Sequence, residues 1–262
     1  MQMRYVLFGD DSTLPGMRNI LGHKVVLSVI ASNRPQSRKA IDPSTVVQPG
    51  KKDPGFGEFV AGLRAAQADV FLCFSYSMIL DKNILAIPPL GAINIHGGLL
   101  PRYRGANVLN WALIEGAAKT GVTAHYMTEG IDDGDVIYSR ETAIEDSDTA
   151  LTLKRCLDQL GFEILTRVGS DLDSGRTLPR IPQNAAEAHY YRRRKPEDGR
   201  VDWEKMSDRD VFNLVRALVS PWPGAFTMAP DGTRVVLDNY LTPDEIPALR
   251  AKYGRRAACS DR

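Results

Sequence analysis

Residues 70–74 and 91–96 read VFLCF and GAINIH, and these two runs decide the fold class of the chain. Apolar residues fill both faces of the first run, which is typical of a strand buried within a parallel sheet. Two similar runs come earlier, at residues 5–8 and 24–31. Such strands alternate with helical patterns over residues 1–180, which predicts an α/β domain with a doubly wound, mostly parallel sheet.

The remaining elements follow from periodicity and turn residues. Apolar residues at helical spacing predict helices at residues 58–66, 79–85, 107–115 and 148–172, the last with Asp146 or Asp148 as its N-cap. Strands are predicted at residues 122–127 and 136–138, on either side of a loop. The polar stretch at residues 32–57 is expected to be a loop.

The character of the chain changes after residue 180. A helix is predicted at residues 210–219 and a hairpin at residues 225–237, around Pro230-Asp231-Gly232. We therefore expect an α/β domain over residues 1–180 and a small C-terminal α+β extension over residues 181–262. The polar, basic stretch at residues 250–262 is expected to be poorly ordered.

Composition excludes several classes of protein. The chain has 262 residues and a net charge of +1, which argues against a strongly basic nucleic-acid binder. Its apolar runs fall well short of the ~18–20 residues of a membrane span, and its N-terminus lacks a signal-peptide pattern. Three widely spaced cysteines fit a reducing cytoplasm, where we expect the protein. The four histidines are not at metal-ligand spacing, so no metal is expected, and dinucleotide and Walker motifs are missing.

The stretch Asn94-Ile95-His96 is the first candidate site. In a strand these two polar side chains, at positions i and i+2, point to the same face. At the carboxyl end of a parallel strand they face the crevice where ligands bind in open α/β sheets. The alternative is that both side chains only satisfy backbone groups of the adjacent loop.

A second candidate lies in the acidic loop at residues 130–135, GIDDGD. Its spacing does not match an EF-hand, and a solvated turn is the simpler interpretation for Asp133 and Asp135. A carboxylate that reaches the histidine raises its pKa and selects its tautomer. An amide, an imidazole and a carboxylate that converge can serve acyl transfer, because the amide stabilises an oxyanion and the imidazole moves a proton.

Two segments, NIHGGLLPRYRGANVLNWALIEG (residues 94–116) and GVTAHYMTEGIDDGDVI (residues 121–137), resemble the formyltransferases that use 10-formyltetrahydrofolate. The resemblance rests on Asn-x-His, then Leu-Leu-Pro, then a Gly-x-Asp loop, and it spans residues 1–227. It implies that Asn94, His96 and Asp132, rather than Asp133, are catalytic. It also implies a folate pocket formed by Met78, Ile79, Leu80, Thr128, Glu129, Gly130 and Ile131, through backbone groups for the most part.

Within this family, residues 191–198 and 216–226 resemble the corresponding segments of sugar-nucleotide formyltransferases. The basic run at residues 192–195 suits a pyrophosphate, although a solvated turn is the alternative. The candidates for contacts with a nucleotide sugar are Tyr76, Tyr103, Arg104, Asn110, Arg192, Arg193, Arg194 and Trp222. For each of them a structural role is the alternative.

The resemblance thus implies transfer of a formyl group to a nucleotide-linked 4-amino-4,6-dideoxysugar for a surface polysaccharide such as O-antigen. GDP-perosamine and the dTDP-linked glucose analogue both fit, and the family suggests a homodimer. No nucleic-acid or membrane partner is expected.

Two alternatives stay open. One is a methionyl-tRNA formyltransferase, although the 35 residues after Thr227 are too few for the tRNA-binding barrel of those enzymes. The other is a noncatalytic folate- or nucleotide-binding protein. Glycinamide ribonucleotide enzymes fit less well, because they generally lack the segment PWPGAF at residues 221–226.

Overall fold

The computed structural model describes residues 2–33, 45–237 and 242–254. These residues form two compact units that are interleaved along the chain. The first, here called the sheet unit, comprises residues 1–104, 121–141 and 157–189; the second, the C-terminal unit, comprises residues 105–120, 142–156 and 190–262. The sequence predicts a single boundary at residue 180, and that boundary stays a prediction.

A seven-stranded sheet organises the fold, in the order β3-β2-β1-β4-β5-β7-β8. Its strands are β1 (Tyr5–Gly9), β2 (Val25–Ala31), β3 (Val46–Gln48), β4 (Val70–Phe74), β5 (Ala92–His96), β7 (Lys119–Tyr126) and β8 (Val136–Ala143). The pairs from β3 to β5 are parallel, whereas β5 and β7 are antiparallel. The prediction of a doubly wound, mostly parallel α/β sheet is confirmed.

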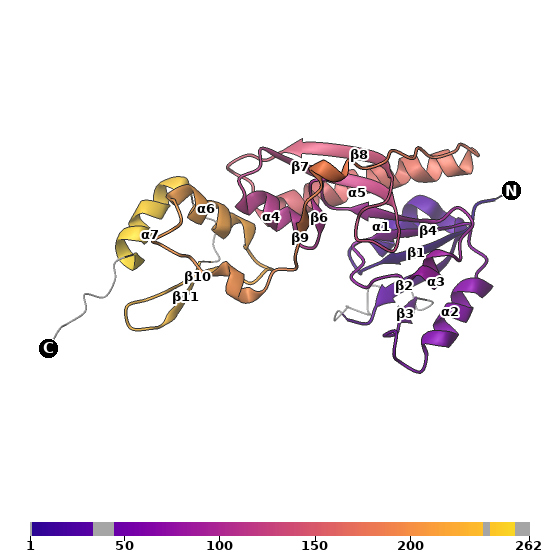
Figure 1. Cartoon of the computed structure of the whole chain (residues 1–262), viewed down its shortest axis with the longest axis horizontal. Coiled ribbons are helices and arrows are strands. Elements are labelled where there is room, and N and C mark those ends of the chain that lie inside the picture. Colours follow the sequence, from indigo (N-terminus) through magenta and orange to yellow (C-terminus); the bar gives the residue numbers. More distant parts are fainter. Residues whose placement is uncertain (1, 34–44, 238–241, 255–262) are drawn as a thin grey trace. The chain divides into compact units, whose positions relative to one another are not determined.

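Alternate residues of the buried strands pack on opposite faces of the sheet, as their apolar character predicts. One face meets α2 (Phe56–Ala65) and α3 (Lys82–Leu85), in a core that contains Val6, Phe8, Phe71, Cys73, Phe59, Leu63 and Ile84. The other face meets α1 (Leu14–Leu21) and α5 (Ala150–Asp173) (Figure 1). Gly16 of α1 permits close packing there, because an added Cβ would lie 2.5 Å from the ring of Phe162.

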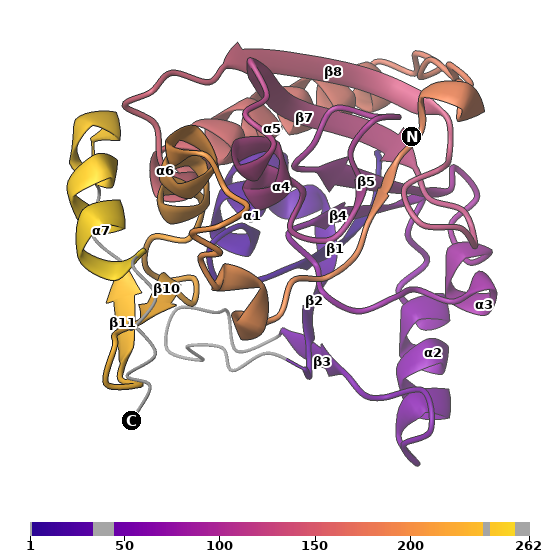
Figure 2. The same cartoon turned by 60° about the vertical axis from the view of Figure 1, so that its left-hand side comes forward.

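The C-terminal unit contains α4 (Val108–Ile114), α6 (Asp208–Ala217), α7 (Ile246–Tyr253) and the hairpin β10 (Ala225–Met228) and β11 (Arg234–Leu237). Figure 2 shows α7 beside the hairpin. Ser207 caps α6, since its hydroxyl accepts from the backbone N–H of Asp210. The hairpin is confirmed as predicted. A further two-stranded pair joins β6 (Arg104–Gly105) and β9 (Tyr190–Tyr191).

Several predicted boundaries are wrong, each for a local reason. The helix predicted at residues 79–85 begins only at Lys82, because the carboxylate of Asp81 caps it. The long helix α5 is capped by Thr149 instead of Asp146 or Asp148, since the Thr149 hydroxyl accepts from the N–H of Thr152. The predicted loop at residues 32–57 includes strand β3, and its residues 34–44 lie outside the described part of the chain.

The basic C-terminal stretch is also better ordered than expected in its first part. Residues 250–253 belong to α7, and the guanidinium of Arg250 donates to the carbonyl oxygens of Trp203 (2.6 Å) and Met206 (2.8 Å). Residues 255–262 lie outside the described part. Among the helices described, none has both the length and the apolar character needed to cross a membrane.

Candidate active site

Four polar side chains form a ladder across β5 and β7. In the antiparallel register Asn94 lies opposite His125, and His96 lies opposite Thr123. Opposite residues of neighbouring strands present their side chains on the same face, so one face of an otherwise apolar strand pair becomes polar. Asp132, from the loop after β7, reaches this face and contacts both imidazoles.

His96 is 8% exposed, and an oxygen atom of the protein lies near each of its ring nitrogens. Nε2 lies 2.6 Å from the carbonyl oxygen of Tyr103. A carbonyl oxygen only accepts hydrogen bonds, so Nε2 carries the proton of the neutral ring. Nδ1 is therefore the nitrogen that gains and loses a proton. It lies 3.6 Å from Oδ2 of Asp132, longer than a direct hydrogen bond.

The surroundings of His96 act on its pKa in opposite directions. Burial has the largest effect and lowers the pKa of His96 below its ordinary value, because the charged ring loses hydration. The Asp132 carboxylate opposes this effect, and the neighbouring His125 adds to it. The net effect favours the neutral ring, while the Asp132 carboxylate favours the imidazolium.

His125 belongs to the same cluster, although the sequence pattern alone assigns it no role. Its Nδ1 donates to the carbonyl oxygen of Tyr126 at 2.8 Å, so Nε2 of the neutral ring is an acceptor. Nε2 lies 3.2 Å from Nδ2 of Asn94 and 3.4 Å from Oδ1 of Asp132. One N–H of the Asn94 amide is used in this way, and the second has no hydrogen-bond partner among the described residues.

A signal for His125 was present in the sequence. Residues 121–127 read GVTAHYM, in which two polar residues alternate with apolar ones inside a buried strand. Thr123 explains the other polar position: its hydroxyl donates to the carbonyl oxygen of Gly98 (2.8 Å) and accepts from the N–H of Leu100 (3.2 Å). The turn after β5 is thereby tied to β7, next to His96.

The loop after β7 places Asp132, and not Asp133, at the histidines. Asp132 has a φ of +53°, a left-handed conformation that aspartate tolerates better than most residues. Asp133 points elsewhere and accepts a hydrogen bond from the hydroxyl of Thr128. Gly134 lets the loop return against β7, because a Cβ there would lie 2.0 Å from the carbonyl oxygen of Tyr126.

The residues predicted for the folate pocket differ in exposure. Leu80 is buried in the hydrophobic core, so its side chain packs inside the protein instead of facing a pocket. Ile79 is 76% exposed and Ile131 is 45% exposed, although both are large and apolar. Met78 is half-buried and its sulfur accepts from the hydroxyl of Ser32. Thr128, Glu129 and Gly130 are exposed, and the Thr128 hydroxyl accepts from the N–H of Gly130 at 3.1 Å.

Three of the residues predicted to contact a nucleotide sugar lie in the sheet unit, and each has a protein partner. The hydroxyl of Tyr76 donates to Oε1 of Gln48 at 2.7 Å. Tyr103 is buried and supplies the carbonyl that binds His96. The guanidinium of Arg104 donates from Nε and Nη2 to Oε1 of Gln183.

The other five lie in the C-terminal unit. Asn110, Arg194 and Trp222 line one small cavity of about 70 Å³. Asn110 is buried and donates to the carbonyl oxygen of Ala217 at 2.6 Å. Arg192 forms a two-pronged ion pair with Asp198, at 2.7 and 2.8 Å. Arg193 is exposed, and its guanidinium has no partner among the described residues.

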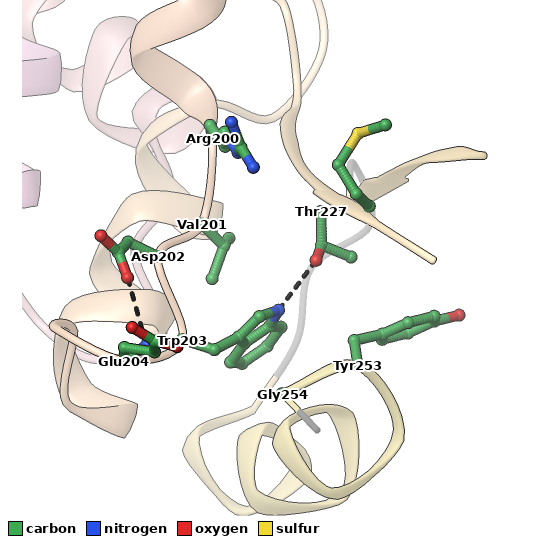
Figure 3. A pocket seen from close by; sticks show the side chains of 9 residues that line it. Arg200, Val201, Asp202, Trp203, Glu204, Thr227, Tyr253 and Gly254 are labelled. Atoms are coloured by element: carbon green, nitrogen blue, oxygen red, sulfur yellow. Dashed lines mark hydrogen bonds between the residues drawn. The ribbon is translucent and has the colours of Figure 1, made fainter. Parts of the chain in front are cut away.

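A larger cavity of about 590 Å³ lies elsewhere in the C-terminal unit, and none of the predicted site residues line it. Figure 3 shows Trp203 in its wall, with the indole N–H donating to the Thr227 hydroxyl at 2.8 Å. Within the described ranges, no group of three or more His, Cys, Asp or Glu side chains is arranged to hold a metal ion.

Models of two protein families match the chain. The model described as formyl transferase matches residues 21–168, more than half of the chain. The model described as formyl transferase, C-terminal domain, matches residues 193–254.

Solved structures share the fold. A 4-N formyltransferase from Francisella tularensis is 20% identical, with a TM-score of 0.75 over 92% of this chain and 98% of that one. A sugar N-formyltransferase from a Shewanella species is also 20% identical, with a TM-score of 0.75 over 92% and 97%. HypX from Aquifex aeolicus, in complex with tetrahydrofolic acid, is 22% identical, with a TM-score of 0.65 over 91% of this chain and 38% of that one.

Proposed function

Because the chain belongs to the formyl transferase family, we propose that it transfers a formyl group from 10-formyltetrahydrofolate to the amino group of a nucleotide-linked sugar. One observation carries the chemistry: Asn94, His96 and Asp132 come from two separate segments and meet in one partly buried cluster. The cluster contains a free amide N–H, a nitrogen that can take a proton and a carboxylate that favours the protonated ring. These are the groups that acyl transfer to an amine requires.

The folate supplies an activated formyl group when it is bound. Two exposed apolar side chains, Ile79 and Ile131, fit contact with its ring system, because large apolar side chains at such exposure gain from being covered. Both lie on segments implied by the family resemblance, the first after β4 and the second in the Asp132 loop. Met78, Leu80, Thr128, Glu129 and Gly130 complete the proposed pocket, with backbone groups as the polar contacts.

The residues of the cluster then have separate tasks. The second N–H of Asn94 donates to the formyl oxygen, where negative charge develops as the amine attacks. Nδ1 of His96 takes the proton that the amine loses and returns it to the nitrogen that leaves. Asp132 stabilises the imidazolium in between, and Nε2 of His125 orients the Asn94 amide by accepting one of its N–H groups.

For the acceptor, we propose a nucleoside-diphosphate 4-amino-4,6-dideoxysugar such as GDP-perosamine or the dTDP-linked glucose analogue, used for O-antigen or another surface polysaccharide. The C-terminal unit supports this choice with the free guanidinium of Arg193 and with a small cavity lined by Asn110, Arg194 and Trp222. We further propose that the protein acts in the cytoplasm, where nucleotide sugars are made, and as a homodimer.

The test is a panel of amine acceptors incubated with the protein and 10-formyltetrahydrofolate. The panel contains GDP- and dTDP-linked aminosugars, glycinamide ribonucleotide and methionyl initiator tRNA. We expect a mass gain of one formyl group on an aminosugar alone. Formylation of the tRNA alone would select the methionyl-tRNA alternative. Folate binding without a product from any acceptor would select a noncatalytic binding protein.

A further inference from the structure

Every hydrogen-bonding position of the Gln183 side-chain amide is occupied by a partner in the sheet unit. Its Nε2 donates to the carbonyl oxygens of Asp132 (2.9 Å) and Gly134 (2.7 Å). Its Oε1 accepts from Nε (3.0 Å) and Nη2 (2.8 Å) of Arg104. Two donors and two acceptor positions are thus occupied. The amide has one orientation only, because rotation by 180° would set its NH₂ against a guanidinium and its oxygen against two carbonyls.

These hydrogen bonds are part of a closed ring of contacts that includes the candidate active site. Nε2 of His96 donates to the carbonyl oxygen of Tyr103, and the next residue along the chain is Arg104. Arg104 binds Gln183, and Gln183 binds the backbone of Asp132. Oδ2 of Asp132 lies 3.6 Å from Nδ1 of His96, which completes the ring of contacts. Both residues of the His96–Asp132 pair are therefore anchored through the same glutamine.

The segment that carries Gln183 follows the Asp132 loop for several residues. Ile181 and Val136 exchange two backbone hydrogen bonds, at 2.8 and 3.0 Å. The Arg180 guanidinium lies 3.7 Å from the carboxylate of Asp135 and 3.6 Å from the centre of the Tyr126 ring. Gln183 extends this contact to Asp132 itself, the residue with the left-handed backbone.

We propose that Gln183, oriented by Arg104, is a positioning residue that sets the placement of the Asp132 carboxylate relative to His96. Arg104 thereby serves the catalytic cluster through Gln183, which differs from the substrate contact implied by the family resemblance. The proposal rests on the proposed function, since it assigns a task to a residue outside the Asn94, His96 and Asp132 set. A left-handed aspartate is strained unless its surroundings hold it, and the two hydrogen bonds of Gln183 to the carbonyl oxygens of Asp132 and Gly134 do so.

The decisive variant is Gln183→Leu, which keeps the approximate volume and removes all four hydrogen bonds. We expect kcat to fall by about 10- to 100-fold, with KM changed by less than about threefold, because displacement by about an ångström is costly in catalysis. Asn184→Leu is the matched control: the neighbouring amide is exposed and bonds only to Glu187 and a local N–H, so kcat should stay unchanged.

A readout independent of turnover keeps this test separate from the proposed function. The charged and titratable groups that face His96 are Asp132 and His125. Since Asp132 raises the pKa of His96, its displacement in Gln183→Leu should lower that pKa, as measured by NMR of labelled histidine. If the parent protein formylates no acceptor, the proposed function fails, whereas the titration still decides the role of Gln183.

Two further variants guard against loss of folding. Arg104→Met should lower kcat by a smaller factor, about three- to tenfold, because Gln183 then loses its orientation but keeps its donors. In the double variant with Gln183→Leu, the loss should equal that of Gln183→Leu alone, since both act through one amide. A folded Gln183→Leu or Arg104→Met protein with parental kcat and an unshifted His96 pKa would overturn the proposal, and so would additive losses.

Discussion

The cluster around His96 and the basic segment at residues 192–195 are both rich in polar groups, but their partners differ. In the cluster, Asn94 retains an N–H, and Nδ1 of His96 lies 3.6 Å from its carboxylate. In the basic segment, Arg192 is fully engaged by Asp198, and this contact holds the pKa of Asp198 well below its usual range.

Arg194 differs from Arg192 within the basic segment, because its Nε is buried without a hydrogen-bond partner among the described residues. Its guanidinium lies 4.7 Å from the centre of the Trp111 ring and donates to the carbonyl oxygen of Asp198 at 2.7 Å. The comparison teaches that charge density alone does not mark a reactive site. Groups with saturated partners support the fold, and groups that keep a donor or a proton position are free to act on a ligand.

The largest effect is expected for His96→Asn. This change removes the only nitrogen in the cluster that we assign to proton transfer, and the rate should fall by ~10²–10⁴. Steady-state kinetics of the purified variant will measure this loss, and far-UV circular dichroism will verify that the variant is folded. A folded variant within tenfold of the parent rate would contradict this role.

Asn94→Ala should be nearly as damaging, with a loss of ~10²–10³ in kcat, because one oxyanion donor disappears. The comparison is Asn110→Ala in the C-terminal unit, whose amide bonds a buried carbonyl and whose place in the proposed acceptor cavity should affect KM rather than kcat. That variant should lower the thermal midpoint of unfolding more than Asn94→Ala does. Equal losses of kcat in the two variants would contradict a specific role of the Asn94 amide in the reaction.

Asp132→Asn should change the pH dependence of the reaction. The carboxylate raises the pKa of His96, so its removal lowers that pKa, and the acid limb of kcat moves to lower pH. The plateau rate should fall at least ~10-fold, since each pKa unit is a tenfold change in imidazolium stability. The acceptor amine titrates identically in both proteins, so the shift reports on His96. Asp133→Asn should leave the profile in place; a shift there instead would mean that the wrong carboxylate was chosen.

Arg193→Ala tests the other region. Its exposed guanidinium is the free member of the basic run, so its loss should raise KM for the nucleotide sugar by up to about fivefold and leave kcat unchanged. Arg192→Ala serves as the comparison, because Asp198 already occupies that guanidinium. A larger rise in KM for Arg192→Ala than for Arg193→Ala would reverse our assignment.

The smallest expected effect concerns stability in acid. Because burial lowers the pKa of His96, the folded protein binds fewer protons than the unfolded chain between that lowered value and ~6.5. The free energy of unfolding therefore falls as pH falls through this window, by at most ~1.4 kcal/mol per pH unit for one group. Urea unfolding of the parent and of His96→Asn should show a shallower decline for the variant. Identical slopes would show that His96 is not buried in its neutral form.

The sequence by itself determined the sheet and the core of the site. Apolar runs such as residues 70–74 form strands wherever they are buried, and Asn94 and His96 share a face because a strand repeats every two residues. The sequence also predicts the hairpin at residues 225–237, because its turn residues favour a turn whatever the rest of the chain does. Strand β3 was missed because it has three residues, and its stability comes from pairing with β2.

Only the tertiary structure decided how the polar groups are shared. Asn94 and His125 are 31 positions apart, and the antiparallel register of β5 and β7 sets them face to face. Gln183 lies 51 positions from Asp132, yet its amide holds the backbone of that residue. Sequence patterns report local periodicity, whereas hydrogen bonds between distant segments depend on strand register and loop return. For that reason the sequence alone identifies Asn94, His96 and Asp132 as candidates, but not His125 and Gln183, which contact them.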